Sequence, residues 1–193
     1  LVRQADGIAE IMSRETGKAI KDARAEVTRS QDTILLSAEE AIRIEGEQVP
    51  LDGTAMGAGK LAFLLRFPVG VVAGITPFNA PFNLACHKVA PALAAGNAIV
   101  LKAPPQSPRV VSMLVELFAE AGTPPGFVNL LYGNTVGPAL VRDPRVDFVS
   151  FAGSSRVGEQ IKAASGLRRV ALELGGNGTT IVHSDADVAE AAT

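Results

Sequence analysis

The stretch VGVVAGI at residues 69–75 decides the fold of this chain. It is short and wholly apolar, which is typical of a parallel strand buried on both faces. Apolar runs and amphipathic segments alternate after it. We predict strands at 98–101, 128–131, 146–151, 170–174 and 179–182, and helices at about 82–95, 108–121, 136–141 and 157–164. This alternation implies right-handed crossovers, so the sequence predicts a Rossmann-like, doubly wound, mostly parallel α/β sheet.

The segment before this run is predicted to be helical over residues 1–45. Ile8, Ile11 and Met12 recur at helical spacing, and charged residues fill the opposite face. Gly17 is expected to divide the segment into two helices, the second running from about residue 18 to residue 44.

A second short segment, residues 46–67, is predicted to be a ribbon. Its first part, 46–59, is rich in glycine and is expected to be a loop or irregular strand, and 60–67 is expected to be a strand that Pro68 ends. The sheet domain then occupies 68–193. Because the chain starts at Leu1 within helical periodicity and stops at Thr193 within a helix that Ser184 or Asp185 can cap, we expect a piece of a longer protein with a truncated sheet domain.

The composition excludes several classes of protein. The chain has 193 residues, 47% of them hydrophobic, and a net charge of −2, so it can bury a core and is not generally disordered. It has no run of eighteen uninterrupted apolar residues, so no membrane span is predicted. The absence of a basic excess argues against a nucleic-acid partner. A lone cysteine, Cys86, and no recognisable targeting signal favour a reducing, cytoplasmic location.

Polar residues follow several of the predicted strands, at the edge where open α/β sheets bind ligands. Asn79, Lys102, the Gly153-Ser154 pair and Glu173 occupy such positions. Taken singly, the first three also have ordinary structural explanations: Asn79 as a helix cap, Lys102 as a solvated lysine, and Gly153-Ser154 as a turn with its cap. Glu173 is expected to be buried in an apolar strand, so its carboxylate needs a partner or a chemical role. No GxGxxG or GxxxxGK[ST] motif follows a strand, but a helix that starts with small residues can bind phosphate through its free N–H groups.

Four motifs in order resemble those of the aldehyde dehydrogenase superfamily, over essentially the whole chain. They are ITPFNAP at 75–81, LKAPPQSP at 101–108, FAGSSRVG at 151–158 and LELGGN at 172–177. The resemblance implies oxidation of an aldehyde to an acid with NAD or NADP, through a cysteine thiohemiacetal and a thioester. It assigns Asn79 as the oxyanion donor and Glu173 as the general base, and it involves no metal.

The resemblance places the nucleophilic cysteine after the LELGG motif, and no cysteine follows Glu173. Cys86 and His87 lie in a predicted helix and are expected to be structural. The fragment is therefore expected to bind the cofactor without turning over.

The resemblance also implies the residues that bind the cofactor: Lys102 at the adenosine ribose, Gly153 and Ser154 beneath the pyrophosphate, and Thr76, Pro77 and Phe78 beside the nicotinamide. The full set is Ile75, Thr76, Pro77, Phe78, Lys102, Pro104, Pro105, Gly133, Gly153, Ser154, Val157, Leu174 and Gly175. NAD-preferring members commonly carry a glutamate at the position of Pro105, so NAD and NADP both stay open. Arg109 is either a partner for a 2′-phosphate or a surface arginine.

The substrate is weakly encoded. The sequence of residues 75–93 is more similar to that of enzymes for lactaldehyde, phosphonoacetaldehyde, glyceraldehyde 3-phosphate and succinate semialdehyde. It is less similar to that of the enzymes for retinal and acetaldehyde. The ribbon at 46–67 resembles the element by which family members dimerise, so a homodimer or homotetramer is expected. A CoA-acylating or phospho-/semialdehyde relative and a non-catalytic family member are the alternatives. The presence of Glu173 favours hydrolysis over transfer to coenzyme A.

Overall fold

A parallel sheet forms the centre of the computed structural model, which describes residues 1–192. Five strands of the described residues build it, in the order β5-β4-β3-β6-β7. They are β3 (Val71–Ile75), β4 (Ala98–Lys102), β5 (Val128–Leu131), β6 (Phe148–Ala152) and β7 (Arg169–Glu173). Every neighbouring pair is parallel. The doubly wound α/β prediction is therefore confirmed.

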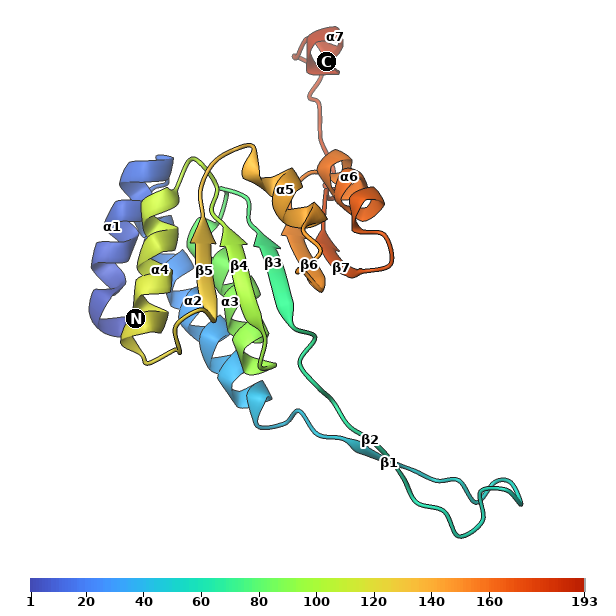
Figure 1. Cartoon of the computed structure of the whole chain (residues 1–193). Coiled ribbons are helices and arrows are strands. Elements are labelled where there is room, and N and C mark those ends of the chain that lie inside the picture. Colours follow the sequence, from blue (N-terminus) through green and yellow to red (C-terminus); the bar gives the residue numbers. More distant parts are fainter. Residues whose placement is uncertain (193) are drawn as a thin grey trace.

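Helices cover both faces of this sheet (Figure 1). One face carries α1 (Ala5–Thr16), α2 (Ile20–Ala41), α3 (Pro81–Ala94) and α4 (Pro108–Glu120), and the other carries α5 (Val136–Arg142) and α6 (Ser155–Ser165). Each face has its own core, and successive strand residues point to opposite faces. Val72 accordingly packs in the core under α1–α4, whereas Ala73 packs in the core under α5 and α6.

The lead segment is helical as predicted. A short 3-10 turn, η1 (Val2–Gln4), precedes α1. Gly17 ends α1 in the left-handed region, with φ +73°, and its N–H donates to the carbonyl of Ser13 at 2.9 Å. Glycine adopts this conformation without steric cost, which explains why the segment divides there. The second helix ends at Ala41, three residues earlier than predicted.

Carboxylates of the lead segment cap two helices of the sheet domain. Helices α3 and α4 both start with proline, and neither N-cap side chain makes a capping hydrogen bond. Glu26 of α2 accepts the N–H groups of Phe82 and Asn83 at 2.9 and 3.1 Å. Glu15 of α1 accepts those of Arg109 and Val110 at 2.8 and 2.9 Å. The first free N–H groups of both helices are thus satisfied from a distant part of the chain.

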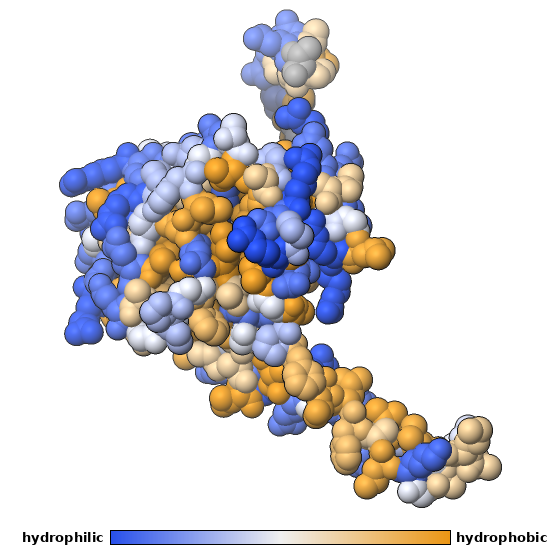
Figure 2. Space-filling model, in the orientation of Figure 1, coloured by the Kyte–Doolittle hydropathy of each residue, from blue (hydrophilic) through white to orange (hydrophobic). Residues whose placement is uncertain are grey.

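A two-stranded ribbon projects from the body of the molecule (Figure 1). Its strands, β1 (Glu47–Val49) and β2 (Ala62–Leu64), pair antiparallel. The prediction of a strand over 60–67 was therefore too long, because only three of those residues face a partner strand. The ribbon surface is largely hydrophobic (Figure 2), and the side chain of Phe63 is 67% exposed.

The C-terminal part departs from the prediction in two places. Residues 179–182 form no strand, because no neighbouring strand pairs with them, and Ile181 is 86% exposed. A last short helix, α7 (Val188–Ala191), does form, but its cap is Asp187 rather than Ser184 or Asp185. The Asp187 carboxylate accepts the N–H groups of Ala189 and Glu190 at 2.9 and 3.1 Å.

Candidate functional site

The candidate site lies at the carboxyl ends of the strands. The chain runs from β3 outward to β4 and β5, then returns to β6 and β7 on the other side of β3. Ligands of open α/β sheets usually bind beside such a reversal of direction, at the carboxyl ends of the strands. Ile75 and Lys102 are the last residues of β3 and β4 and lie side by side in register. The Thr76 hydroxyl donates to the Lys102 carbonyl at 3.4 Å.

A cavity of about 380 Å³ opens between α5, α6 and these strand ends. Three predicted cofactor residues, Ile75, Lys102 and Val157, line it together. The remaining lining residues were not predicted: Asn134, Gly137, Pro138, Val141, Arg142, Gln160, Ile161 and Ala164. Residues 160, 161 and 164 follow Val157 at helical spacing, so the periodicity of α6 is the signal that could have found them.

Lys102 supplies a cation to this cavity. Its side chain is partly buried, and this burial lowers the pKa of the ammonium from its usual value because the charged form loses hydration. A lysine at this position can donate to hydroxyl or phosphate oxygens of a ligand.

The start of α6 contributes Val157 to this cavity. The Ser154 hydroxyl caps the helix by accepting the Val157 N–H at 3.4 Å. Gly153 follows β6 so closely that a Cβ there would lie 2.5 Å from the Phe151 ring. The first N–H groups of a helix have no intrahelical partner, and they attract anions. The donor set of Lys102 and this helix start therefore fits a dinucleotide, with its hydroxyls and phosphates.

The end of β7 packs against α6. A Cβ on Gly158 would lie 2.4 Å from Leu174 Cδ2, so the glycine allows Leu174 to approach the helix. The Gly175 N–H donates to the Ser155 hydroxyl at 3.4 Å. This packing brings the predicted residues Leu174 and Gly175 to the same helix start as Ser154.

Several other residues predicted to bind cofactor do not line this cavity. Pro77 is half-buried and Phe78 is exposed, and both lie between β3 and α3. Pro104 is buried, whereas Pro105 is exposed. Gly133, with φ +111°, immediately precedes Asn134 of the cavity.

Arg109 was considered as a partner for a 2′-phosphate. Its guanidinium instead pairs with Glu116, one of the exposed residues of α4. The structure thus favours the surface-arginine interpretation.

Asn79 is exposed in the loop between β3 and α3. Its backbone carbonyl accepts a hydrogen bond from the Lys18 ammonium at 2.7 Å. The loop is thereby tied to the linker between α1 and α2.

Glu173 ends β7 and is exposed, so the prediction that it lies buried in an apolar strand was wrong. The reason is its position in the sheet: β7 is the outermost strand within the described residues and has a neighbour on one side only.

Lys88 of α3 is a residue that sequence reasoning missed. Its side chain is almost fully buried, with 7% exposed, and the ammonium donates to the Ser150 hydroxyl of β6 at 3.1 Å. Burial lowers the pKa of Lys88 to about 8, and the nearby Glu173 carboxylate acts in the opposite direction. Lys88 therefore lies within electrostatic reach of Glu173. Ala85 and Ala92, three residues before and four after, are buried, and this apolar spacing was the available signal.

Cys86 is fully buried among apolar residues of α3, as predicted for a structural cysteine. Burial raises the pKa of its thiol to about 12. Because the thiolate is the nucleophilic form, Cys86 is inert at neutral pH.

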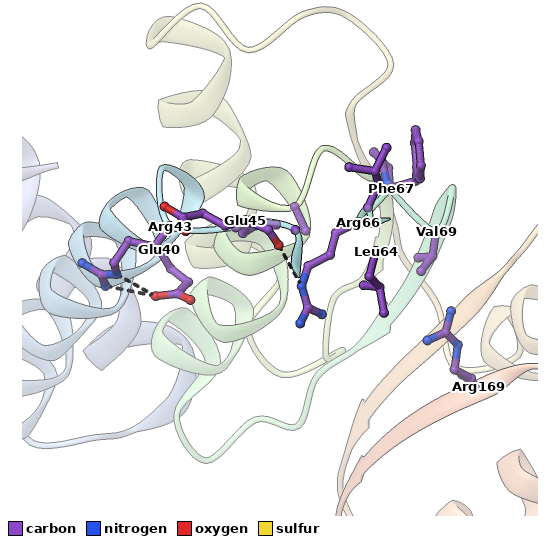
Figure 3. Close-up of a pocket in the computed structure, with 13 residues that line it drawn as sticks. Glu40, Arg43, Glu45, Leu64, Arg66, Phe67, Val69 and Arg169 are labelled. Carbon is purple, nitrogen blue, oxygen red and sulfur yellow. Dashed lines mark hydrogen bonds and ion pairs between the residues drawn. The ribbon is translucent and has the colours of Figure 1, made fainter. Parts of the chain in front are cut away.

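A larger cavity, of about 890 Å³, lies at the root of the ribbon (Figure 3). Arg43 pairs there with Glu40, and the Arg66 guanidinium donates to the Glu45 carbonyl. Arg169, the first residue of β7, also lines it. This cavity therefore lies at the amino ends of the strands, away from the residues assembled around β3.

Within residues 1–192, no helix is long and apolar enough to cross a membrane. In the same part of the chain, no cluster of three histidine, cysteine or acidic residues is placed to hold a metal ion.

The chain is similar to curated aldehyde dehydrogenases. The chain is 48% identical over 195 residues to a 3-sulfolactaldehyde dehydrogenase of Priestia aryabhattai, an alignment that covers 100% of this chain and 41% of the relative. It is 42% identical to an NADP-dependent glyceraldehyde-3-phosphate dehydrogenase of Streptococcus equinus, covering 97% of this chain and 40% of the relative. It thus spans about two fifths of the length of these curated relatives.

The fold matches solved structures as well. The NADP complex of an NADP-dependent glyceraldehyde-3-phosphate dehydrogenase from Bacillus halodurans C-125 superimposes with a TM-score of 0.86 at 38% identity, covering 90% of this chain and 37% of that one. The sequence model of the aldehyde dehydrogenase family matches residues 1–193. This chain therefore belongs to the aldehyde dehydrogenase family.

Proposed function

We propose that the chain supplies the NAD(P) site, the oxyanion donor and the general base of an enzyme that oxidises an aldehyde to a carboxylic acid. The observation that carries this proposal is the convergence of Ile75, Lys102 and Val157 on one cavity beside the open start of α6. These residues come from three separate parts of the sequence, and each was predicted from a family motif.

Lys102 and the start of α6 would hold the dinucleotide. The Lys102 ammonium would donate to the ribose hydroxyls, and the N–H groups that follow Ser154 would face the pyrophosphate. When bound, the nicotinamide supplies an acceptor for the hydride of the aldehyde carbon. Pro105 offers no carboxylate to repel a 2′-phosphate, so acceptance of NADP as well as NAD follows.

Asn79 and Glu173 would act on the substrate. After a cysteine thiolate from outside this chain attacks the aldehyde carbon, the Asn79 amide would donate to the developing oxyanion, a contact typically worth ~2.7–4 kcal/mol in other enzymes. Glu173 would take the proton of the thiol or of the hydrolytic water. The Lys88 ammonium lies within electrostatic reach of this carboxylate.

The substrate we propose is an aldehyde that carries an anionic group. This proposal is supported by the names of two similar relatives, each of which describes an aldehyde that carries a sulfonate or a phosphate. A CoA-acylating or phospho-/semialdehyde relative and a non-catalytic member are the competing functions. The presence of Glu173 favours hydrolysis over transfer to coenzyme A, whereas the residue at the nucleophile position separates an enzyme from a non-catalytic member.

We further propose that the ribbon is a self-association element. Its exposed apolar side chains, including Phe63 and Leu64, lie on a strand with an open edge. Such edges pair readily with another chain, so a homodimer or homotetramer follows.

The test uses the full-length protein with glyceraldehyde 3-phosphate and either NAD or NADP, followed by cofactor reduction. Lys102→Ala is expected to weaken cofactor binding roughly tenfold or more, as loss of a hydrogen bond from a charged donor does. Lys162→Ala, at an exposed lysine of α6, is the matched control. Equal cofactor affinity in both variants would refute the assignment of the cavity, and a full-length protein that oxidises no aldehyde would refute the activity.

A further inference from the structure

Glu26 is a fully buried carboxylate, with 0% exposed, in the middle of α2. One oxygen, Oε1, accepts both N–H groups at the start of α3, those of Phe82 and Asn83. The other oxygen, Oε2, pairs with the ammonium of Lys18. A buried charge needs such partners because its desolvation is costly.

Lys18 connects Glu26 to the loop that precedes α3. It lies in the linker between α1 and α2, and its ammonium also donates to the backbone carbonyl of Asn79 at 2.7 Å. Asn79 precedes α3 by two residues. The backbone is therefore held on both sides of Ala80: Lys18 holds the carbonyl of Asn79, and Glu26 holds the first turn of the helix.

Capping alone does not require this arrangement. A serine or aspartate at position 80 would cap α3 locally. Glu15 caps α4, and within residues 1–192 no lysine bridges it to the preceding loop. The contact peculiar to Glu26 is the one that reaches Asn79 through Lys18. Buried ion pairs are in general weak evidence for stability, so a positioning role accounts better for the pair.

We propose that Lys18 and Glu26 are positioning residues that fix the backbone of Asn79, and through it the side-chain amide, for donation to the oxyanion. The inference rests on the proposed function. Oxyanion donors act because they are oriented before charge develops, and a functional group must be held to within about 0.5 Å of its productive position.

The decisive variant is the double substitution Lys18→Met/Glu26→Gln in the full-length protein. It removes both charges together, so no unpaired charge is left in the core. The glutamine oxygen can still accept from Phe82 and Asn83, which preserves the cap while cutting the tether to Asn79. The double substitution Asp6→Asn/Arg24→Met is the matched control, because it removes an exposed ion pair between the same two helices, α1 and α2.

The kinetic readout separates positioning from stability. With glyceraldehyde 3-phosphate as the probe, kcat of Lys18→Met/Glu26→Gln is expected to fall about 10- to 100-fold, the range for a misplaced catalytic group. KM for aldehyde and cofactor stay within about twofold, because the oxyanion contact strengthens only in the transition state. The single variant Lys18→Arg keeps a donor for the Asn79 carbonyl, so its kcat should stay close to that of the wild type. An unchanged kcat in the decisive variant, or an equal loss in the control, would overturn the proposal.

A crystal structure of the same variant gives a readout that does not depend on turnover. Asn79 Cα is expected to move by about 0.5 Å or more relative to the wild type, while the first turn of α3 stays in place. An unmoved Asn79 overturns the positioning role even if activity changes. Absence of turnover by the wild-type protein refutes the proposed function, and the crystal comparison still decides whether the pair fixes Asn79.

Discussion

Replacing Lys88 with methionine is expected to change how stability depends on pH. Lys88 is 7% exposed, and burial lowers the pKa of its ammonium from 10.5 to about 8. Each pKa unit corresponds to 1.36 kcal/mol, so the folded state disfavours the protonated lysine by about 3 kcal/mol. Methionine has a similar length and carries no charge to desolvate.

The direction of the effect follows from proton binding. Between pH 8 and pH 10.5 the unfolded chain holds more protons on Lys88 than the folded chain does. The free energy of unfolding of the wild type therefore rises with pH in this window, relative to Lys88→Met. From pH 7 to pH 10 the gap between the two proteins should close by about 2 kcal/mol.

Guanidinium unfolding of both proteins at pH 7, 8, 9 and 10 measures this gap. Lys162→Met, at an exposed lysine of α6, serves as the control and should track the wild type at every pH. Parallel curves for the wild type and Lys88→Met would show that Lys88 is not desolvated in the folded state. A gap that widens with pH would contradict the sign of the argument.

Three further results are expected. Glu15→Ala removes the remote cap of α4 and should lower the free energy of unfolding by about 1–2 kcal/mol in denaturant titrations; no loss would show that solvent replaces the cap. Cys86 should react with a thiol reagent only at the rate of unfolding, since burial raises the pKa of its thiol to about 12, and rapid labelling of folded protein would contradict this. Pro105→Glu in the full-length protein should raise the Kd for NADP more than that for NAD, because a carboxylate repels a 2′-phosphate; equal changes in calorimetric titrations would place the adenosine ribose elsewhere.

The alternating elements were predictable because each leaves a local pattern. The apolar run at 69–75 gave the central strand, and Gly17 marked the break between α1 and α2 through its left-handed conformation. The segment at 179–182 is apolar too, but a strand also needs a neighbour with free hydrogen-bonding groups, and none is present beside it within the described residues. Local pattern therefore predicts a strand without establishing its pairing.

The candidate site was predictable only in part. Ile75, Lys102 and Val157 were predicted from motifs, and they line one cavity together. The exposure of Glu173 and the burial of Lys88 depend instead on which elements pack against them, and neither leaves a local signal as strong as a motif. Contacts such as that from Glu26 to Phe82 join residues 56 positions apart, so only the folded chain reveals them.

Each remote capping carboxylate is synthesised before the helix that it caps. Glu26 is made 56 residues before Phe82, and Glu15 is made 94 residues before Arg109. Both carboxylates have therefore left the ribosome by the time the helices that need them emerge, and each helix can complete its first turn as soon as it meets the earlier segment. A circular permutant that moved residues 1–45 to the C-terminus would reverse this order, and α3 and α4 would emerge without the acceptors for their first turns.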